Sequence, residues 1–387
     1  MSAPLSGTVM RSTNERHVLA CLRDHEPISR ADLADRLGLT RAAITRIVAD
    51  LIERGYITES GLNVGRPGRP STRLELSRRW ASIGFDSRAH RTEIVAMEMG
   101  GRVLHRELLE LPGGIPADQY VSLLASSVQR IRAAIPHQLA GVGVALPGRL
   151  SEDRTIVEKT HFFPWDSFPL VRELTAALDG VPVGLRHNAE CAAIANARQP
   201  ELAGRDRLLH LQVGIGLGIA LTRNQDLDDT LPVGWGGAGH VQLGDMNRRC
   251  VCGRYGCIDT VVGFPAFSQR ALAAGVPMPE GPDAMDELAS LIAAEARAGQ
   301  MWAKDSIDEL RVAMTRVLSL FVTIEVPDAV TVGGYMLSLS DDFMASLSES
   351  VAYQLKSPSP IIRTTIEDHA AGLGAAIVGL NQIMTLR

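Results

Sequence analysis

The feature that most restricts the fold of this chain is a short run of three cysteines, Cys250, Cys252 and Cys257, with His240 upstream of it. Glycines bend this segment into a loop, and four sulfur and nitrogen donors match the tetrahedral coordination that zinc prefers. We therefore predict a closed, structural zinc (Zn2+) site held by His240, Cys250, Cys252 and Cys257. Since four protein ligands leave no position for water, hydrolytic zinc chemistry is not expected. A disulfide within the run is the alternative interpretation.

The other two cysteines, Cys21 and Cys191, lie in apolar helical patterns and are expected in the core. The N-terminal residues do not form a secretory signal pattern, which favours a cytoplasmic protein whose thiols stay reduced and available for metal. No apolar run approaches the roughly 18 residues of a membrane span, so we expect a soluble protein without a membrane partner.

The length of 387 residues is sufficient for about two or three domains, each with its own core. The formal charge of −5 is unevenly distributed, because residues 1–78 hold 12 arginines against 9 acidic residues. The N-terminal segment is therefore the basic part of the chain, and arginine suits contacts to phosphate and guanine.

This basic segment has the pattern of a helix-turn-helix. Apolar residues at helical spacing predict a first helix over residues 14–23. Ser29 is predicted to cap a second helix, which Gly38 ends, and Thr40 to cap a third helix over residues 41–52. The inner face of the third helix consists of Ile44, Ile47, Val48 and Leu51.

The third helix leaves Arg41, Thr45 and Arg46 on its outward side, near the N-terminal end. A polar helix face that follows a short turn is the geometry that places a recognition helix in the major groove of DNA. We therefore predict that these three residues bind DNA. The alternative is a small helical subdomain whose arginines are solvated.

Two short strand patterns, residues 56–59 and 72–76, follow the third helix and predict a wing. Between them lies the stretch Gly-Arg-Pro-Gly-Arg-Pro over residues 65–70. A stiff, extended loop of this kind suits contacts along phosphates or in a minor groove, so Arg66 and Arg69 are further candidates for DNA binding. A flexible linker with incidental charge is the alternative.

The rest of the chain alternates strand and helix patterns, with glycine turns at the strand ends, which indicates an α/β fold. Strands are predicted over residues 82–86, 92–97, 102–106, 139–146, 181–185, 207–213 and 329–332, and helices over residues 189–197 and from residue 370 onward. We predict a winged helix-turn-helix domain over residues 1–78 and a second, larger domain over residues 79–387.

The order of helix-turn-helix, Gly-Arg-Pro wing, Gly239-His240 and Cys-X-Cys-Gly-X-X-Gly-Cys resembles the transcription-factor branch of the ROK family (repressor, open reading frame, kinase). This resemblance implies two α/β lobes of the actin-like, sugar-kinase type around a cleft, with the zinc site in residues 240–257. It also implies operator DNA as partner, a sugar or sugar-phosphate effector, and a homodimer or homotetramer.

Family kinases resemble one another in a phosphate loop, Asp-X-Gly-Gly-Thr, and in an Asn-Asp pair whose aspartate accepts the proton of the sugar hydroxyl. This chain has Asp-Ser-Arg-Ala-His over residues 86–90, without either glycine. The second pair reads Asn188-Ala189, and an alanine cannot accept a proton. Glu190 follows, but one helix position turns a side chain by about 100°. The sequence therefore predicts no catalytic residues and no kinase activity.

The sugar pocket that the resemblance implies is altered as well. Gly237 stands where the family has a glutamate that hydrogen-bonds sugar hydroxyls, and Asp259 stands where another glutamate follows the last cysteine. The remaining candidates for ligand binding are Asn188, His240 and Asp259. For Asn188 a helix cap is the alternative role, and for Asp259 a cap of the segment that follows.

Together these features predict a zinc-stabilised transcriptional regulator, a repressor, that responds to a carbohydrate-type effector. Two other functions remain open on the sequence: a sugar kinase fused to a DNA-binding domain, and an effector-independent DNA-binding protein.

Overall fold

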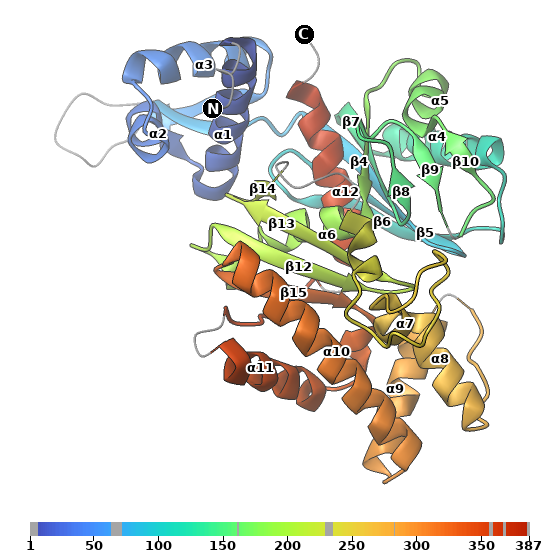
Figure 1. Cartoon of the computed structure of the whole chain (residues 1–387). Coiled ribbons are helices and arrows are strands. Elements are labelled where there is room, and N and C mark those ends of the chain that lie inside the picture. Colours follow the sequence, from blue (N-terminus) through green and yellow to red (C-terminus); the bar gives the residue numbers. More distant parts are fainter. Residues whose placement is uncertain are drawn as a thin grey trace.

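The computed structural model describes residues 7–62, 72–160, 162–228, 235–281, 283–355, 359–366 and 369–384. Figure 1 shows three parts: a small N-terminal head, here residues 7–76, and two larger α/β lobes. Among the described residues, no helix combines the length and apolar character needed to cross a membrane.

The head contains three helices and a three-stranded sheet, and its central helices begin and end where the sequence predicts. Its elements are α1 (Gly7–His25), β1 (Ile28–Ser29), α2 (Arg30–Leu37), α3 (Arg41–Glu53), β2 (Ile57–Leu62) and β3 (Thr72–Leu76). The Ser29 side chain accepts a hydrogen bond from the Asp32 amide, and Thr40 accepts one from the Ala43 amide, both at 3.2 Å. Gly38 ends α2 in the left-handed region, at φ 62°. Two elements depart from expectation: α1 begins at Gly7 rather than Asn14, and β2 ends at Leu62 rather than Glu59.

The antiparallel sheet of the head has the order β1-β3-β2. The predicted inner face of α3, formed by Ile44, Ile47, Val48 and Leu51, is buried against it. Three helices packed on a β-hairpin form a winged helix-turn-helix.

Lobe one is a five-stranded mixed sheet of order β11-β7-β4-β5-β6, covered by helices on both faces. Its strands are β4 (Trp80–Ser87), β5 (Arg91–Glu98), β6 (Val103–Glu110), β7 (Gln138–Leu146) and β11 (Val183–His187). The helices α4 (Ala117–Ala134) and α5 (Leu170–Ala177) share one apolar core with the sheet. On the other face α6 (Asn188–Asn196) and α12 (Ala370–Asn381) share a second core. A small sheet adjoins this lobe, formed by β8 (Arg149–Leu150), β9 (Val157–Lys159) and β10 (Asp166–Phe168).

Lobe two is a four-stranded sheet of order β14-β13-β12-β15 with the largest apolar core of the described chain. Its strands are β12 (Arg207–Val213), β13 (Leu217–Arg223), β14 (Asp226–Leu227) and β15 (Ala329–Gly334). Its helices are α7 (Asp259–Val262), α8 (Phe264–Ala273), α9 (Ala284–Arg297), α10 (Met301–Glu325) and α11 (Asp341–Leu355). The glycine loop between β12 and β13 reverses the chain into an antiparallel neighbour.

Glycines bring α12 unusually close to its neighbours in lobe one. A Cβ atom on Gly143 of β7 would lie 1.8 Å from the Ala375 carbonyl oxygen of α12. A Cβ atom on Gly374 of α12 would lie 1.8 Å from the carbonyl oxygen of Cys191 in α6. Because only glycine permits such approach, α6, α12 and the sheet form one close-packed unit. Cys191 is fully buried in it, as predicted for a core cysteine.

Candidate functional site: a cavity between the lobes beside a four-ligand cluster

A cavity of about 1810 Å³ lies between the two lobes and takes side chains from both. Lobe one contributes the β4–β5 turn and the start of α6, including Arg88 and Asn188. Lobe two contributes the glycine loop Gly214–Gly218, His240 and Asp259. All three predicted ligand-binding residues, Asn188, His240 and Asp259, therefore line one cavity.

The four predicted metal ligands come together at the edge of this cavity. The Nδ1 atom of His240 lies 3.6 Å from Cys250 Sγ, and Cys252 Sγ lies 3.6 Å from Cys257 Sγ. All four ligand atoms lie within 4.8 Å of one another. Donors that surround a zinc ion at about 2.0–2.3 Å are roughly 3.3–3.8 Å apart in a tetrahedron, so the cluster fits a metal ion. The disulfide alternative is wrong, because a bonded pair would be about 2.05 Å apart and all the described cysteines are free.

The cysteine loop is built to converge these donors. Gly253 and Gly256 adopt φ values of 89° and 76°, which lets the chain turn between Cys250 and Cys257. Burial and the neighbouring Cys252 and Cys250 sulfurs raise the pKa of Cys257 to about 12. A cation among the sulfurs would favour the thiolate forms, which are the forms that bind a metal ion.

Asp259 joins the metal cluster to the glycine loop. One carboxylate oxygen accepts a hydrogen bond from the Leu217 amide at 2.9 Å, and the other lies 3.7 Å from His240 Nδ1. A Cβ atom on Gly239 would lie 1.8 Å from the Asp259 carboxylate, which explains the glycine beside the histidine. The N-cap of α7 is Ile258, so the alternative that Asp259 caps the following segment is wrong.

The start of α6 places two polar side chains in the cavity. His187 is the N-cap, and its Nδ1 accepts a hydrogen bond from the Ala189 amide at 3.2 Å. Glu190 accepts one from the His187 amide at 3.0 Å and completes a capping box. Asn188 is the first helical residue rather than the cap, although its Oδ1 also accepts from the Ala189 amide at 3.0 Å. Burial lowers the pKa of His187, so this imidazole is neutral at pH 7.

The structure corrects the position assigned to the missing catalytic base. Ala189 is fully buried and does not line the cavity, and a Cβ atom on Gly218 would lie 2.8 Å from its methyl group. The cavity-facing residue is Asn188, one position earlier. A neutral amide at this position is no better a proton acceptor than alanine. Glu190 is engaged elsewhere, in the capping box and in an ion pair with Arg154 at 3.0 Å.

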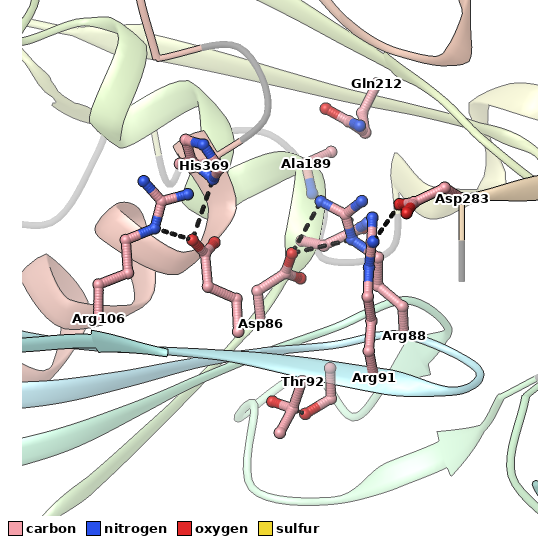
Figure 2. A network of polar contacts seen from close by, with 12 residues as sticks. Asp86, Arg88, Arg91, Thr92, Arg106, Ala189, Gln212, Asp283 and His369 are labelled. Carbon is pink, nitrogen blue, oxygen red and sulfur yellow. Dashed lines mark hydrogen bonds and ion pairs between the residues drawn. The ribbon is translucent and has the colours of Figure 1, made fainter. Parts of the chain in front are cut away.

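The β4–β5 turn holds arginines where a phosphate loop would keep glycines. Arg88 donates from Nε to Asp86 Oδ2 at 3.0 Å, and Asp86 is only 1% exposed. Arg91 forms an ion pair with Asp283 of lobe two, so it bridges the two lobes. Figure 2 shows both arginines with their carboxylate partners. Bulky cationic side chains thus occupy the turn in which kinases expose backbone amides.

One cavity residue, Gln212 on β12, had no signal in the sequence. Its side-chain oxygen lies 3.1 Å from Nε2 of His210, whose Nδ1 lies 2.9 Å from the Thr331 hydroxyl on β15. These contacts fix the side-chain amide of Gln212 next to Gly333. A Cβ atom on Gly333 would lie 2.4 Å from the side-chain oxygen of Gln212. Burial lowers the pKa of His210 to about 4, so the imidazole stays neutral. His210 and Gln212 share β12, and the pairing of β12 with β15 brings Thr331 beside them.

The predicted DNA-binding residues that the structure describes lie on the head and do not line the cavity. Arg41, Thr45 and Arg46 are exposed on α3, and the Thr45 hydroxyl donates to the Arg41 carbonyl at 2.8 Å. Arg66 and Arg69 lie outside the described residues, between β2 and β3.

A winged head on two α/β lobes, with a cavity and a His-Cys cluster between them, defines a class: a sugar-kinase-type body joined to a helix-turn-helix domain. The sequence model of the ROK family matches residues 82–382, so the chain belongs to the ROK family. The model of the MarR family matches residues 12–60, within the head.

Two proteins that are similar to this chain over nearly its whole length are transcriptional regulators. The N-acetylglucosamine repressor of Escherichia coli O6:H1 is 22% identical over 378 residues, which cover 95% of this chain and 92% of that protein. The crystal structure of a ROK family transcriptional regulator, a homologue of the E. coli MLC protein, is 22% identical with a TM-score of 0.78, and covers 97% of this chain and 98% of its own.

The body is also shared with enzymes. A ROK hexokinase from Thermus thermophilus is 21% identical with a TM-score of 0.68, over 79% of this chain and 99% of that one. At such identities the likeness shows the fold alone. The activity has to be argued from the cavity residues and the head.

Proposed function

We propose that this protein is a DNA-binding transcriptional repressor that responds to a carbohydrate. The observation that carries the proposal is the exposed N-terminal face of α3, with Arg41, Thr45 and Arg46 free of the apolar core. In a winged helix-turn-helix this face enters the major groove, and Arg66 and Arg69 of the wing add contacts to the backbone or minor groove.

In this proposal the effector binds in the cavity between the lobes. Asn188, His240 and Asp259 line it from both lobes and offer amide, imidazole and carboxylate groups that suit sugar hydroxyls. A ligand that touches both lobes changes the free energy of their relative placement, which is what an effector requires.

We propose that the protein binds a structural zinc ion, held by His240, Cys250, Cys252 and Cys257. The fit rests on the spacing of the four donors, which leaves no open ligand position. Through Asp259, the same loop supports the glycine loop of the cavity. We assign the protein to the cytoplasm, as a homodimer or homotetramer, with residues 1–78 as the DNA-binding domain and 79–387 as the ROK domain.

We further propose that the protein has no phosphotransferase activity. The residue of α6 that faces the cavity is an amide, and Arg88 covers the buried Asp86. Phosphoryl transfer depends on positioning and electrostatic stabilisation, and both the base and the phosphate loop are altered.

The proposal is tested by selecting operator fragments from genomic DNA and measuring their affinity with and without a sugar panel. We expect a discrete operator whose affinity falls when one sugar is added. A protein that binds no DNA selectively would contradict the proposal. An ATP-consumption assay on the same panel addresses the fused-kinase alternative, and thermal shift addresses the effector-independent one.

A further inference from the structure

The head is attached to lobe one by a buried junction. Ile383, in the 3-10 turn Gln382–Met384 after α12, is 1% exposed and belongs to the apolar core of the head. Its carbonyl oxygen accepts hydrogen bonds from the Tyr56 hydroxyl at 3.5 Å and from Arg54 at 3.4 Å. The indole of Trp80, on β4, donates to the Gly55 carbonyl at 2.9 Å.

Arg54 ties this junction to the rest of the head. Its guanidinium pairs with Glu15 of α1 at 3.1 Å and with Asp50 of α3 at 3.2 Å. It also lies 4.7 Å from the centre of the Tyr56 ring. A movement of the C-terminal turn relative to the head would disturb all of these contacts together, so the two move as one body.

The same junction connects to the cavity through lobe one. The turn that carries Ile383 directly follows α12, and α12 packs at backbone distance against α6 and β7 through Gly374 and Gly143. The first residue of α6 is Asn188, which lines the cavity. The head is therefore fixed to the lobe that holds one wall of the cavity.

The head also touches lobe two, at a different kind of contact. Arg23, in the last turn of α1, donates to the side-chain oxygen of Gln225 at 3.1 Å. Gln225 lies in the β13–β14 turn, and β13 begins at Leu217, whose amide Asp259 holds at the cavity. Figure 1 shows the head beside both the end of α12 and the β14 side of lobe two.

The head is fixed on one lobe and hydrogen-bonded to the other, so a change in the relative position of the lobes alters the contacts of the head. We infer that the Arg23–Gln225 contact couples the cavity to the head: when a ligand changes the angle between the lobes, the Ile383 junction persists and the Arg23–Gln225 contact is made or broken. This inference rests on the proposed function, because it needs an effector in the cavity and an operator on the head. A rigid-body lobe movement of this kind is a common way to convert ligand binding into a distant change.

Gln225→Ala tests the coupling without touching the head. The measured quantity is the ratio of operator affinities with and without sugar, using D-glucose, D-xylose and N-acetyl-D-glucosamine as probes. Coupling of this kind is typically about 5–150-fold, and we expect the variant to reduce the ratio to less than about 2-fold. Its affinity for the sugar should stay within about 2-fold of the wild type, since Gln225 does not line the cavity.

Arg36→Ala is the matched control, because Arg36 contacts His25 inside the head and should leave the ratio unchanged. A Gln225→Ala protein that keeps the full wild-type ratio overturns the inference while the proposed function stands. If no sugar alters operator affinity even in the wild type, the effector part of the proposed function fails instead.

Hydrogen exchange provides a second measurement that needs no ligand. In Gln225→Ala, the amides of the last turn of α1 should exchange several-fold faster, because local opening of this turn no longer has to break the Arg23–Gln225 contact. The amides of β2 near the Ile383 junction should be unchanged. Equal exchange of the α1 turn in both proteins would show that the contact carries no restraint, and would overturn the inference.

Discussion

At the scale of single residues, one helix position decides which side chain of α6 reaches the cavity. The pattern Asn188-Ala189 suggests an alanine in place of a catalytic aspartate. His187, however, takes the cap, so Asn188 faces the cavity and Ala189 faces β13. A sequence motif gives the residue types, whereas the helix start gives their direction.

The opposite orientation of these two side chains predicts opposite results for two neighbouring substitutions. Ala189→Asp should lower the free energy of unfolding by about 2–4 kcal/mol, because it buries an unpaired carboxylate against Gly218. Asn188→Asp keeps the size of the side chain and should fold normally. Denaturant unfolding measures both, and an Ala189→Asp protein as stable as Asn188→Asp would contradict the register. Neither variant should phosphorylate glucose in a coupled assay, because Arg88 still occupies the phosphate loop.

A second residue of interest, Glu93 on β5, lies outside the cavity in a buried polar cluster. Arg106 donates from Nε to its carboxylate at 2.6 Å, and His369 Nδ1 lies 3.0 Å from the same oxygen. In Figure 2, dashed lines from Arg106 and His369 meet at the same carboxylate oxygen, on a side chain that carries no label. Burial, opposed by Arg106 and reinforced by the charge of Asp86, raises the pKa of Glu93 to about 7.

A carboxyl group whose pKa is higher in the folded than in the unfolded protein makes stability fall as pH rises between those two values. For Glu93 this window extends from its ordinary value of 4.5 to about 7. Glu93→Gln should remove that fall, on the order of 1–3 kcal/mol between pH 5 and pH 8. Unfolding curves at several pH values measure it. A Glu93→Gln protein with the wild-type pH dependence would assign the fall to other groups.

At the scale of elements, the loops and helix ends are fixed by donors and acceptors that are close in sequence. Ser29, Gly38 and Thr40 define the helix-turn-helix, and the glycines of residues 250–257 shape the cysteine loop. These features were predictable because each one depends on a few neighbouring residues.

Cys252→Ser tests the proposed zinc site of the cysteine loop. The variant should lose most of its zinc, from about one ion per chain to near none, and its unfolding free energy should fall by roughly 2 kcal/mol or more, because metal binding contributes to folding. Elemental analysis and thermal unfolding measure the two effects. Cys21→Ala, in the head, should keep its zinc. Wild-type protein prepared without chelator and found free of zinc would refute the assignment.

Arg46→Ala tests the recognition helix. Operator affinity should fall by about 1–3 kcal/mol if Arg46 makes a bidentate base contact, and selectivity at one base pair should relax. Arg69→Ala should instead weaken binding to all DNA sequences. The slope of the logarithm of the affinity against the logarithm of the salt concentration should become shallower by about one. Arg132→Ala, on the exposed side of α4, serves as control. Full operator affinity in both the Arg46 and the Arg69 variants would exclude the winged-helix interpretation.

At the scale of the whole molecule, the sequence predicted the order of domains and the fold class but not the contacts that join the parts. The Tyr56–Ile383 and Arg23–Gln225 hydrogen bonds join residues 327 and 202 positions apart. No local pattern reports such pairs. The polar chain from Thr331 through His210 to Gln212 was missed for the same reason, since it depends on the pairing of two distant strands.

The proposed oligomer should bind two half-sites on one face of the DNA, about 10–10.5 base pairs apart or a multiple of that spacing. Inserting about five base pairs between the half-sites should weaken binding strongly, and inserting about ten should restore much of it. Footprinting and mobility shift on the spaced operators measure this. Equal affinity at every spacing would indicate that a single head binds alone.

The place of Ile383 in the head also has a consequence for synthesis of the protein. The ribosome completes α1, α2, α3 and the wing early, but one side chain of their apolar core, that of Ile383, is made 327 residues after Tyr56. A nascent or prematurely terminated chain therefore carries a head with an uncovered apolar surface, a substrate for chaperones and proteases rather than a finished DNA reader. We therefore expect chains that end before Ile383 to bind the operator more weakly than the chain of 387 residues.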